Sequence, residues 1–105
     1  MNSQFKKGVI ELCVLALLRK GELYGYELIK ELSEKFPVKG DTIYPVLKRL
    51  THGGLLLTYI RESSQGPRRK YFKITSEGEQ KYQELRSEWM EFSSIVSEII
   101  EEESY

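Results

Sequence analysis

The sequence predicts a mainly α-helical protein with one small β-hairpin, an α+β fold, and three observations lead to this prediction. The stretch 40–50 carries apolar residues at the i, i+3, i+4 and i+7 spacing of a helix. A stretch rich in Leu, Tyr and Ile, 55–61, and an alternating stretch, 68–75, enclose turn-forming residues and predict a hairpin. From residue 76 onward apolar residues recur every three or four positions, which predicts one long terminal helix. A short helix followed at once by a hairpin is the layout of a winged helix-turn-helix.

Two more helices are predicted ahead of this pair. The stretch 5–19 has apolar residues at three- and four-residue steps, and Gly21 follows as a residue that tolerates the left-handed end of a helix. The stretch 24–35 has a second apolar side and closes at Phe36, because a residue before proline avoids helical angles. The apolar sides comprise Phe5, Val9, Leu12, Cys13, Ala16 and Leu17 in the first helix, and Leu28, Ile29, Leu32 and Phe36 in the second.

The helix of the winged layout has one apolar and one polar side. We expect it to begin at Gly40 or Asp41, with Asp41 as its cap and Pro45 near the first turn, where a missing N–H costs least. The core-facing residues are Ile43, Val46, Leu47 and Leu50. The outward residues are Tyr44 and Lys48, flanked by Thr42, Pro45 and Arg49. An α-helix fits the major groove of DNA, so we interpret this outward side as a DNA-reading surface. A solvated basic side is the alternative.

The tip of the predicted hairpin is basic. Turn-forming residues occupy 63–67, and Arg68, Arg69 and Lys70 follow directly. Three adjacent cations would neutralise phosphates and release counterions from the backbone that flanks the groove. The returning strand is expected to carry Phe72 and Ile74 on one face, and Arg69, Tyr71 and Lys73 on the other.

The terminal helix is predicted to begin with Ser76 as its cap and Glu79 three residues later, the pattern of a capping box. Its apolar seam comprises Tyr82, Leu85, Trp89, Phe92, Val96 and Ile99. A small core cannot bury a seam of this length, so we expect a second copy of the chain to cover Leu85, Trp89, Phe92, Val96 and Ile99. Packing on the first helix of the same chain is the alternative. We therefore divide the chain into a DNA-binding domain, 1–75, and a dimerisation helix, 76–105.

Charge is distributed unevenly along a chain whose formal net charge is zero. Residues 1–75 carry fourteen Lys and Arg against seven Asp and Glu, a surplus of seven positive charges. Residues 76–105 carry two against nine, a surplus of seven negative charges. The first part would attract a polyanion and the second would be repelled by one.

Several classes of protein are disfavoured. No run approaches the ~18 apolar residues of a membrane span. The single cysteine, Cys13, rules out an internal disulfide and favours the cytoplasm, and its apolar surroundings indicate a packing role. The single histidine, His52, cannot form a metal site with so distant a cysteine. Because no catalytic motif occurs, we expect no enzyme, no cofactor and no metal.

Six motifs follow one another between residues 5 and 92 and together form a specific pattern. They are Tyr24-Gly25-Tyr26-Glu27, Thr42-Ile43-Tyr44-Pro45-Val46-Leu47-Lys48-Arg49-Leu50, Gly54-Leu55-Leu56, Gly66-Pro67-Arg68-Arg69-Lys70-Tyr71-Phe72-Lys73-Ile74-Thr75, Gly78 and Glu88-Trp89. This pattern resembles the PadR family of bacterial transcriptional regulators. The short chain looks like the small subfamily with one C-terminal helix, and the wing motif and the tryptophan are similar to those of its lactococcal multidrug-resistance regulator.

The resemblance implies a homodimeric winged-helix repressor, held together by the last helix with help from the first. It implies binding to double-stranded DNA at an inverted repeat in a promoter. On this basis the expected DNA contacts are Tyr24, Lys39, Thr42, Tyr44, Lys48, Arg68, Arg69 and Lys70.

The resemblance also implies an effector site, because some relatives bind a planar drug or phenolic compound at the dimer interface. Carried over to this chain, the site consists of Trp89 with Gly8, Glu11 and Leu12 facing it from the first helix. Glu11 would favour cationic aromatic ligands there. Trp89 also lies on the seam, so packing within the dimer is its alternative role. Two other functions stay open: a winged-helix module that binds protein, and a small-molecule binding protein without DNA activity.

Overall fold

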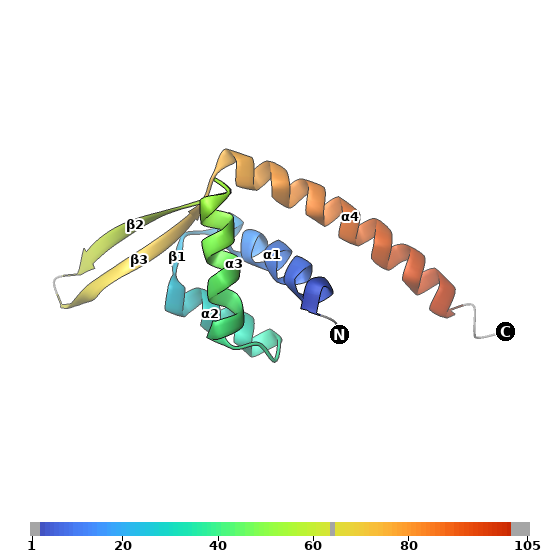
Figure 1. Cartoon of the computed structure of the whole chain (residues 1–105), viewed down its shortest axis with the longest axis horizontal. Coiled ribbons are helices and arrows are strands. Elements are labelled where there is room, and N and C mark those ends of the chain that lie inside the picture. Colours follow the sequence, from blue (N-terminus) through green and yellow to red (C-terminus); the bar gives the residue numbers. More distant parts are fainter. Residues whose placement is uncertain (1–2, 64, 102–105) are drawn as a thin grey trace.

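The computed structural model describes residues 3–63 and 65–101, and Figure 1 shows how their helices and strands are arranged. The predicted α+β fold is confirmed. In chain order the elements are α1 (Ser3–Lys20), β1 (Leu23–Tyr24), α2 (Gly25–Lys35), α3 (Gly40–His52), β2 (Leu56–Ser63), β3 (Gly66–Ile74) and α4 (Ser76–Glu101). The β2–β3 hairpin and α4 project from opposite sides of the α1–α3 group (Figure 1).

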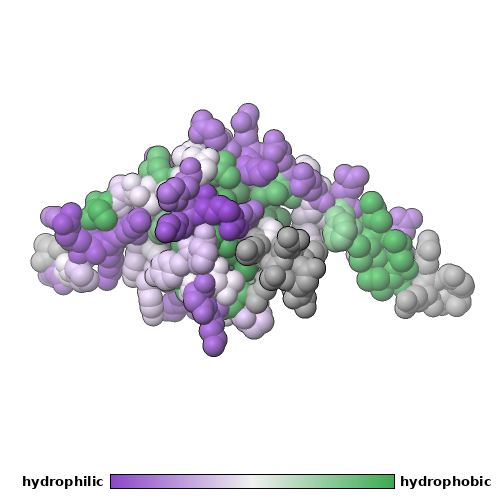
Figure 2. All heavy atoms as spheres, in the orientation of Figure 1, coloured by the Kyte–Doolittle hydropathy of each residue, from purple (hydrophilic) through white to green (hydrophobic). Residues whose placement is uncertain are grey.

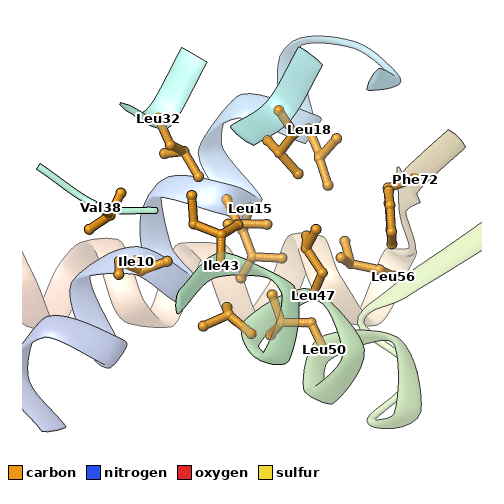
Figure 3. Packing of buried hydrophobic residues seen from close by; sticks show 13 residues of the cluster. Ile10, Leu15, Leu18, Leu32, Val38, Ile43, Leu47, Leu50, Leu56 and Phe72 are labelled. Carbon is orange, nitrogen blue, oxygen red and sulfur yellow. The ribbon is translucent and has the colours of Figure 1, made fainter. Parts of the chain in front are cut away.

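The apolar side of α3 forms the centre of the core, as predicted. Its four apolar residues are at most 3 % exposed, and Figure 3 shows them packed against side chains of α1 and α2. The cluster comprises Ile10, Val14, Leu15, Leu18, Leu28, Leu32, Val38, Ile43, Val46, Leu47, Leu50, Leu56 and Phe72. Full burial of one such side chain contributes about 1.5–3 kcal/mol of transfer free energy. The orientation of α3 about its own axis is therefore strongly determined.

The apolar side predicted for the first helix is not the most deeply buried side of α1, although Cys13 and Leu17 pack against the core. The buried residues are Ile10, Val14, Leu15 and Leu18. The predicted residues with described side chains are half-buried: Val9, Leu12, Cys13, Ala16 and Leu17. The side chain of Phe5 lies outside what the structure describes. The helix contacts α2, α3, β3 and α4, and these neighbours together surround most of its circumference. A helix surrounded in this way has no single stripe from which its deepest side can be read.

The sheet has three antiparallel strands in the order β1-β3-β2. Leu56 pairs with Ile74 and Arg61 with Arg69, so the predicted hairpin is present with Phe72 buried on its inner face. The predicted turn includes Ser64, which lies outside the described residues. Strand β1 was not predicted, because a strand of two residues is too short to show alternation.

Both predicted helix caps differ from the observed ones. The N-cap of α3 is Lys39, which makes no side-chain cap bond, while Asp41 lies in the first turn and Pro45 inside the helix. The N-terminus of α4 is capped by Thr75, whose hydroxyl oxygen accepts a hydrogen bond from the Gly78 N–H at 3.0 Å. The observed cap of α4 therefore lies one residue before Ser76, the predicted cap. Thr75 takes the position because its own N–H bonds to the Leu55 carbonyl at 3.1 Å, which ties it to the end of the hairpin.

The two halves of α4 have different surroundings. Tyr82 and Leu85 pack against the core, next to α1. Beyond them the helix extends past α1 (Figure 1), and Phe92 and Ile99 are 51 % and 62 % exposed. Figure 2 shows the resulting hydrophobic area over the C-terminal half of α4. Packing on α1 therefore accounts for the first part of the seam and leaves the second part at the surface. No described helix has the length and apolar character needed to cross a membrane.

The start of α4 yields a test of this packing. A Cβ atom on buried Gly78 would lie 2.1 Å from the Leu55 carbonyl oxygen and 2.7 Å from Cγ1 of Ile74. We expect Gly78→Ala to lower the free energy of unfolding by about 1–3 kcal/mol, although alanine favours helices. Urea unfolding followed by circular dichroism measures this change. Gly21→Ala is the control, because its Cβ would meet nothing within 4 Å, and equal stabilities of the two variants would contradict the packing described.

Candidate nucleic-acid interface

A cleft of about 620 Å³ lies between α3, the start of α2 and the basic part of β3. Its lining residues are Tyr24, Gly25, Tyr26, Tyr44, Leu47, Lys48, Thr51, His52, Arg68, Arg69, Lys70 and Phe72. The fold thus brings together six of the eight expected DNA contacts from three separate stretches of sequence. Lys39 and Thr42 do not line the cleft: Lys39 is exposed at the N-cap of α3, and Thr42 is half-buried in its first turn.

The α3 wall of the cleft follows from the burial of the opposite side of the helix. Tyr44, Lys48 and His52 are four residues apart, so they form one outward stripe. The Tyr44 side chain is 55 % exposed, and its ring lies close to Gly25 and Gly40, between the starts of α2 and α3. This stripe presents a phenol, an ammonium and an imidazole to the cleft.

The β2–β3 hairpin, called the wing from here on, contributes three exposed cations to the other wall of the cleft. Arg68 forms an ion pair with Glu62 at 3.2 Å, and both side chains are at least 70 % exposed. The Arg69 guanidinium lies 4.5 Å from the centroid of the Tyr24 ring, and the Lys70 ammonium lies 5.8 Å from that of Phe72. Surface ion pairs such as Arg68–Glu62 contribute ~0–1 kcal/mol, so Arg68 can exchange its partner for a phosphate at small cost.

Six lining residues were not among the candidate site residues. Leu47 and Phe72 were predicted to face the inside of the fold, and Gly25, Tyr26, Thr51 and His52 were missed. His52 could have been found from its place one turn beyond Lys48, but its nearness to a glycine pair suggested only the end of a helix. Tyr26 is 66 % exposed and its ring stacks 6.4 Å from that of Tyr24. It follows Tyr24 by two residues, and only the change from strand to helix at Gly25 brings both rings to one place.

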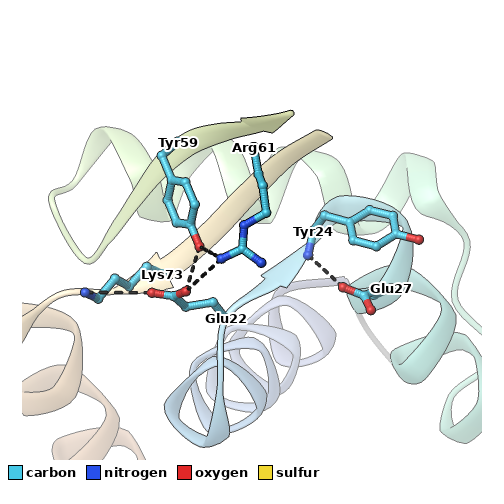
Figure 4. A network of polar contacts seen from close by, with 6 residues as sticks. All are labelled: Glu22, Tyr24, Glu27, Tyr59, Arg61 and Lys73. Carbon is cyan, nitrogen blue, oxygen red and sulfur yellow. Dashed lines mark hydrogen bonds and ion pairs between the residues drawn. The ribbon is translucent and has the colours of Figure 1, made fainter. Parts of the chain in front are cut away.

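A polar network joins the loop before β1 to the outer face of the sheet (Figure 4). The Glu22 carboxylate accepts a hydrogen bond from the Tyr59 hydroxyl at 2.6 Å and lies 3.7 Å from the Lys73 ammonium. The hydrogen bond to Glu22 holds the pKa of Tyr59 above its ordinary value, because the bond is lost when the phenol ionises. At the start of α2, the Glu27 carboxylate accepts a hydrogen bond from the Tyr24 N–H at 3.1 Å.

A second pocket, of about 470 Å³, lies between α1 and α4. It is lined by Gly8, Val9, Leu12, Leu85, Glu88, Trp89 and Phe92. Three of the four expected effector residues therefore lie together. Glu11 does not line this pocket: its carboxylate is paired with the Arg49 guanidinium at 2.6 Å, which turns it toward α3. Glu88, one residue before the tryptophan, is the acidic residue that lines this pocket.

The described residues show no other arrangement with evident chemistry. Residues 3–63 and 65–101 contain no group of three or more His, Cys, Asp or Glu residues placed to hold a metal ion. Cys13 is half-buried, and burial raises the pKa of its thiol, which disfavours the reactive thiolate.

Comparison with known proteins identifies the family. Residues 14–84 match the transcriptional regulator PadR-like family. The chain belongs to this family. PadR-like proteins are transcriptional regulators and not enzymes, and the cleft between α3 and the wing is accordingly a candidate DNA-binding surface.

Several individual relatives are similar along most of this chain. The crystal structure of a PadR-like transcriptional regulator from Bacillus cereus is 36 % identical, with a TM-score of 0.83, and the match covers 92 % of this chain and 96 % of that one. The negative transcriptional regulator PadR of Bacillus subtilis is 32 % identical over an alignment of 101 residues, and the match covers 90 % of this chain and 52 % of that protein. Bacillus subtilis PadR in complex with operator DNA superposes with a TM-score of 0.63, covering 72 % of this chain and 45 % of that one, at 32 % identity.

The Glu22–Tyr59 hydrogen bond can be tested by titration. We expect Glu22→Gln to lower the pKa of Tyr59 toward the ordinary value of about 10, because the charged acceptor is lost. A raised pKa in the folded state means that the bond stabilises the fold below about pH 10, and that this contribution is lost as pH rises through the folded pKa. Carbon NMR of the tyrosine rings measures the pKa, and Tyr59→Phe assigns the resonance. An unchanged pKa in Glu22→Gln would contradict the assignment of the bond.

Proposed function

We propose that this PadR-like protein is a cytoplasmic homodimeric repressor that binds an inverted repeat in a promoter. Its effector would be a planar aromatic ligand, bound at the dimer interface, that releases the protein from DNA. The observation that carries the proposal is the cleft in which the outward stripe of α3 faces the cations of the wing. Residues 1–75 carry a surplus of seven positive charges, which supports a polyanionic partner for this part of the chain.

In this proposal α3 enters the major groove and the wing holds the adjacent backbone. Tyr44 and Lys48 are exposed on the outward side of α3 and would contact base edges or phosphates, with Thr42 nearby. Arg68, Arg69 and Lys70 would neutralise phosphates beside the groove. The expected phosphate contacts outside these two groups are Tyr24 at the cleft and Lys39 at the N-cap of α3.

The proposed dimer rests on the C-terminal half of α4. Phe92, Ile95, Ile99 and Ile100 are each more than half exposed, a concentration of apolar surface that an isolated small domain rarely leaves in water. The seam formed by Leu85, Trp89, Phe92, Val96 and Ile99 would pack on its copy. Two-fold symmetry would then place the two α3 helices about one turn of DNA apart.

The proposed effector site is the pocket between α1 and α4. Its walls are mostly apolar, with the Trp89 ring on one side and Gly8 and Leu12 on the other. A planar aromatic ligand could stack there. Glu88 rather than Glu11 supplies the carboxylate, so a cationic ligand would be favoured through Glu88. Release from DNA then requires that the ligand bind more tightly to the arrangement of the two wings that does not fit the operator.

Fluorescence anisotropy tests the proposal with a labelled duplex from the region upstream of the protein's own gene, beside a scrambled duplex, at two salt concentrations. The proposal expects tight binding that prefers the native sequence and weakens steeply with salt. Absence of binding to either duplex at low salt would overturn it and favour a protein-interaction module. Binding of an aromatic ligand without any effect on DNA would favour a small-molecule binding protein.

The wing contribution is tested by Lys70→Ala. We expect weaker binding to both duplexes and a salt dependence that falls by about one phosphate contact per protomer, because one cation no longer displaces counterions. A series of anisotropy titrations at increasing KCl measures the slope. Lys81→Ala is the control, since it removes the same charge from α4, away from the cleft. An unchanged slope in Lys70→Ala would remove the wing from the interface.

The dimer contribution is tested by Trp89→Ala. Because the ring lies on the seam, we expect dimerisation to weaken by on the order of 2 kcal/mol, the scale of an aromatic hot spot. Sedimentation velocity over a dilution series measures the dissociation constant. Glu91→Ala, two residues along and therefore on the opposite side of α4, serves as the control. If Trp89→Ala sedimented like the wild type at every concentration, the proposed seam would be wrong.

A further inference from the structure

The outer face of the sheet carries a row of three tyrosine rings. Tyr24 of β1 and Tyr59 of β2 each pair with Tyr71 of β3, so one ring comes from each strand. The Tyr71 centroid lies 5.6 Å from that of Tyr24 and 5.5 Å from that of Tyr59. Residues directly opposite each other project from the same face of a sheet. The row therefore lies on the face opposite to that of Phe72, which is buried in the core.

Two arginines lie on this row. The Arg61 guanidinium is 4.4 Å from the Tyr71 centroid, and that of Arg69 is 4.5 Å from the Tyr24 centroid. Arg61 and Arg69 are paired in register, and like charges directly opposite each other destabilise a hairpin. Each guanidinium rests on a different ring, where the π-electrons attract a cation. The rings thus accommodate a pair of charges that the hairpin alone would disfavour.

Arg61 is held and yet accessible. It donates a hydrogen bond to the Tyr59 hydroxyl at 3.2 Å, and its side chain is 57 % exposed. The Glu22 carboxylate lies 4.0 Å away and is engaged more closely by the Tyr59 hydroxyl, at 2.6 Å (Figure 4). Because a guanidinium has five N–H donors, Arg61 keeps donors that a phosphate could use.

We propose that Arg61 is a phosphate-binding residue of the wing, and that Tyr71 is a positioning residue that holds the Arg61 guanidinium ready for the DNA backbone. This inference rests on the proposed DNA-binding function and adds a second strand, β2, to the contacts expected from β3. A guanidinium stacked on a ring before binding loses less side-chain freedom when it meets a phosphate. This proposal accounts for the like-charge pair Arg61–Arg69, because both cations would bind the same polyanion.

The phosphate contact is tested with Arg61→Gln, which removes the charge and keeps a long side chain with hydrogen-bonding capacity. The probe is a fluorescein-labelled duplex of scrambled sequence, titrated by anisotropy over a series of KCl concentrations. We expect the slope of log affinity against log salt to fall by about one per protomer. Lys81→Gln, the matched loss of one charge on α4, should leave the slope unchanged. An unchanged slope in Arg61→Gln overturns the contact.

The positioning role is tested by separating the ring from the charge. Tyr71→Phe keeps the ring and should bind with wild-type affinity, whereas Tyr71→Leu should bind several-fold more weakly. In an Arg61→Gln background the loss caused by Tyr71→Leu should become much smaller, because the ring no longer has that guanidinium to hold. Equal losses in the two backgrounds overturn the positioning role.

A further variant leaves the three tyrosines unchanged. Arg61→Lys keeps the charge but loses the planar group that stacks on the ring, so we expect an unchanged salt slope with weaker affinity. Wild-type affinity in Arg61→Lys would overturn the role of stacking. Thermal unfolding by circular dichroism confirms that each variant is folded at the temperature of the titration.

The same measurements separate this inference from the function on which it rests. If the wild-type protein binds neither this duplex nor the promoter duplex at low salt, the proposed function fails and this inference falls with it. If the wild type binds and Lys70→Ala lowers the slope while Arg61→Gln does not, the proposed function stands and this inference alone is overturned.

Discussion

The structure depends on the burial of one side of α3. Its four core residues are each at most 3 % exposed, so rotation of the helix about its axis would expose side chains worth about 1.5–3 kcal/mol each. The outward direction of Tyr44, Lys48 and His52 is therefore a consequence of core packing. A surface that must match a groove benefits from this arrangement, because the cost of holding the side chains in place is met by the fold and not by the ligand.

Two sets of contacts fix the remaining parts relative to α3. The pairing of Leu23 with Phe72 ties the hairpin to the helices through β1, which places the wing cations across the cleft from α3. At the other side, Thr75 caps α4 and the close approach of Gly78 to the Leu55 carbonyl sets the direction in which α4 leaves the core. The β1–β3 pairing thus positions the wing, and the contacts of Leu55 with Thr75 and Gly78 position α4.

The Glu11–Arg49 ion pair connects two helices that each line one of the pockets. The ion pair joins the α1 wall of the pocket at Trp89 to α3, with Glu11 one residue before Leu12 of that wall. The Glu11 side chain is 23 % exposed, so its interaction with Arg49 is less screened than those of the exposed pairs on the wing. The ion pair therefore restrains the position of α1 relative to α3.

The sequence by itself determined the elements whose signal is local. The stripe of α3, the hairpin and the long α4 each have one buried side and one exposed side, so their periods predicted them. These patterns and the family resemblance together indicated half of the residues that line the cleft. Only the tertiary structure decided the rest. The deepest side of α1 depends on neighbours that surround it, β1 exists through its pairing with β3, and Thr75 caps α4 because Leu55 holds its backbone. Likewise Glu11 turns away from Trp89 because Arg49, thirty-eight residues later, lies within reach of its carboxylate. These features depend on contacts between distant segments, which no local pattern records.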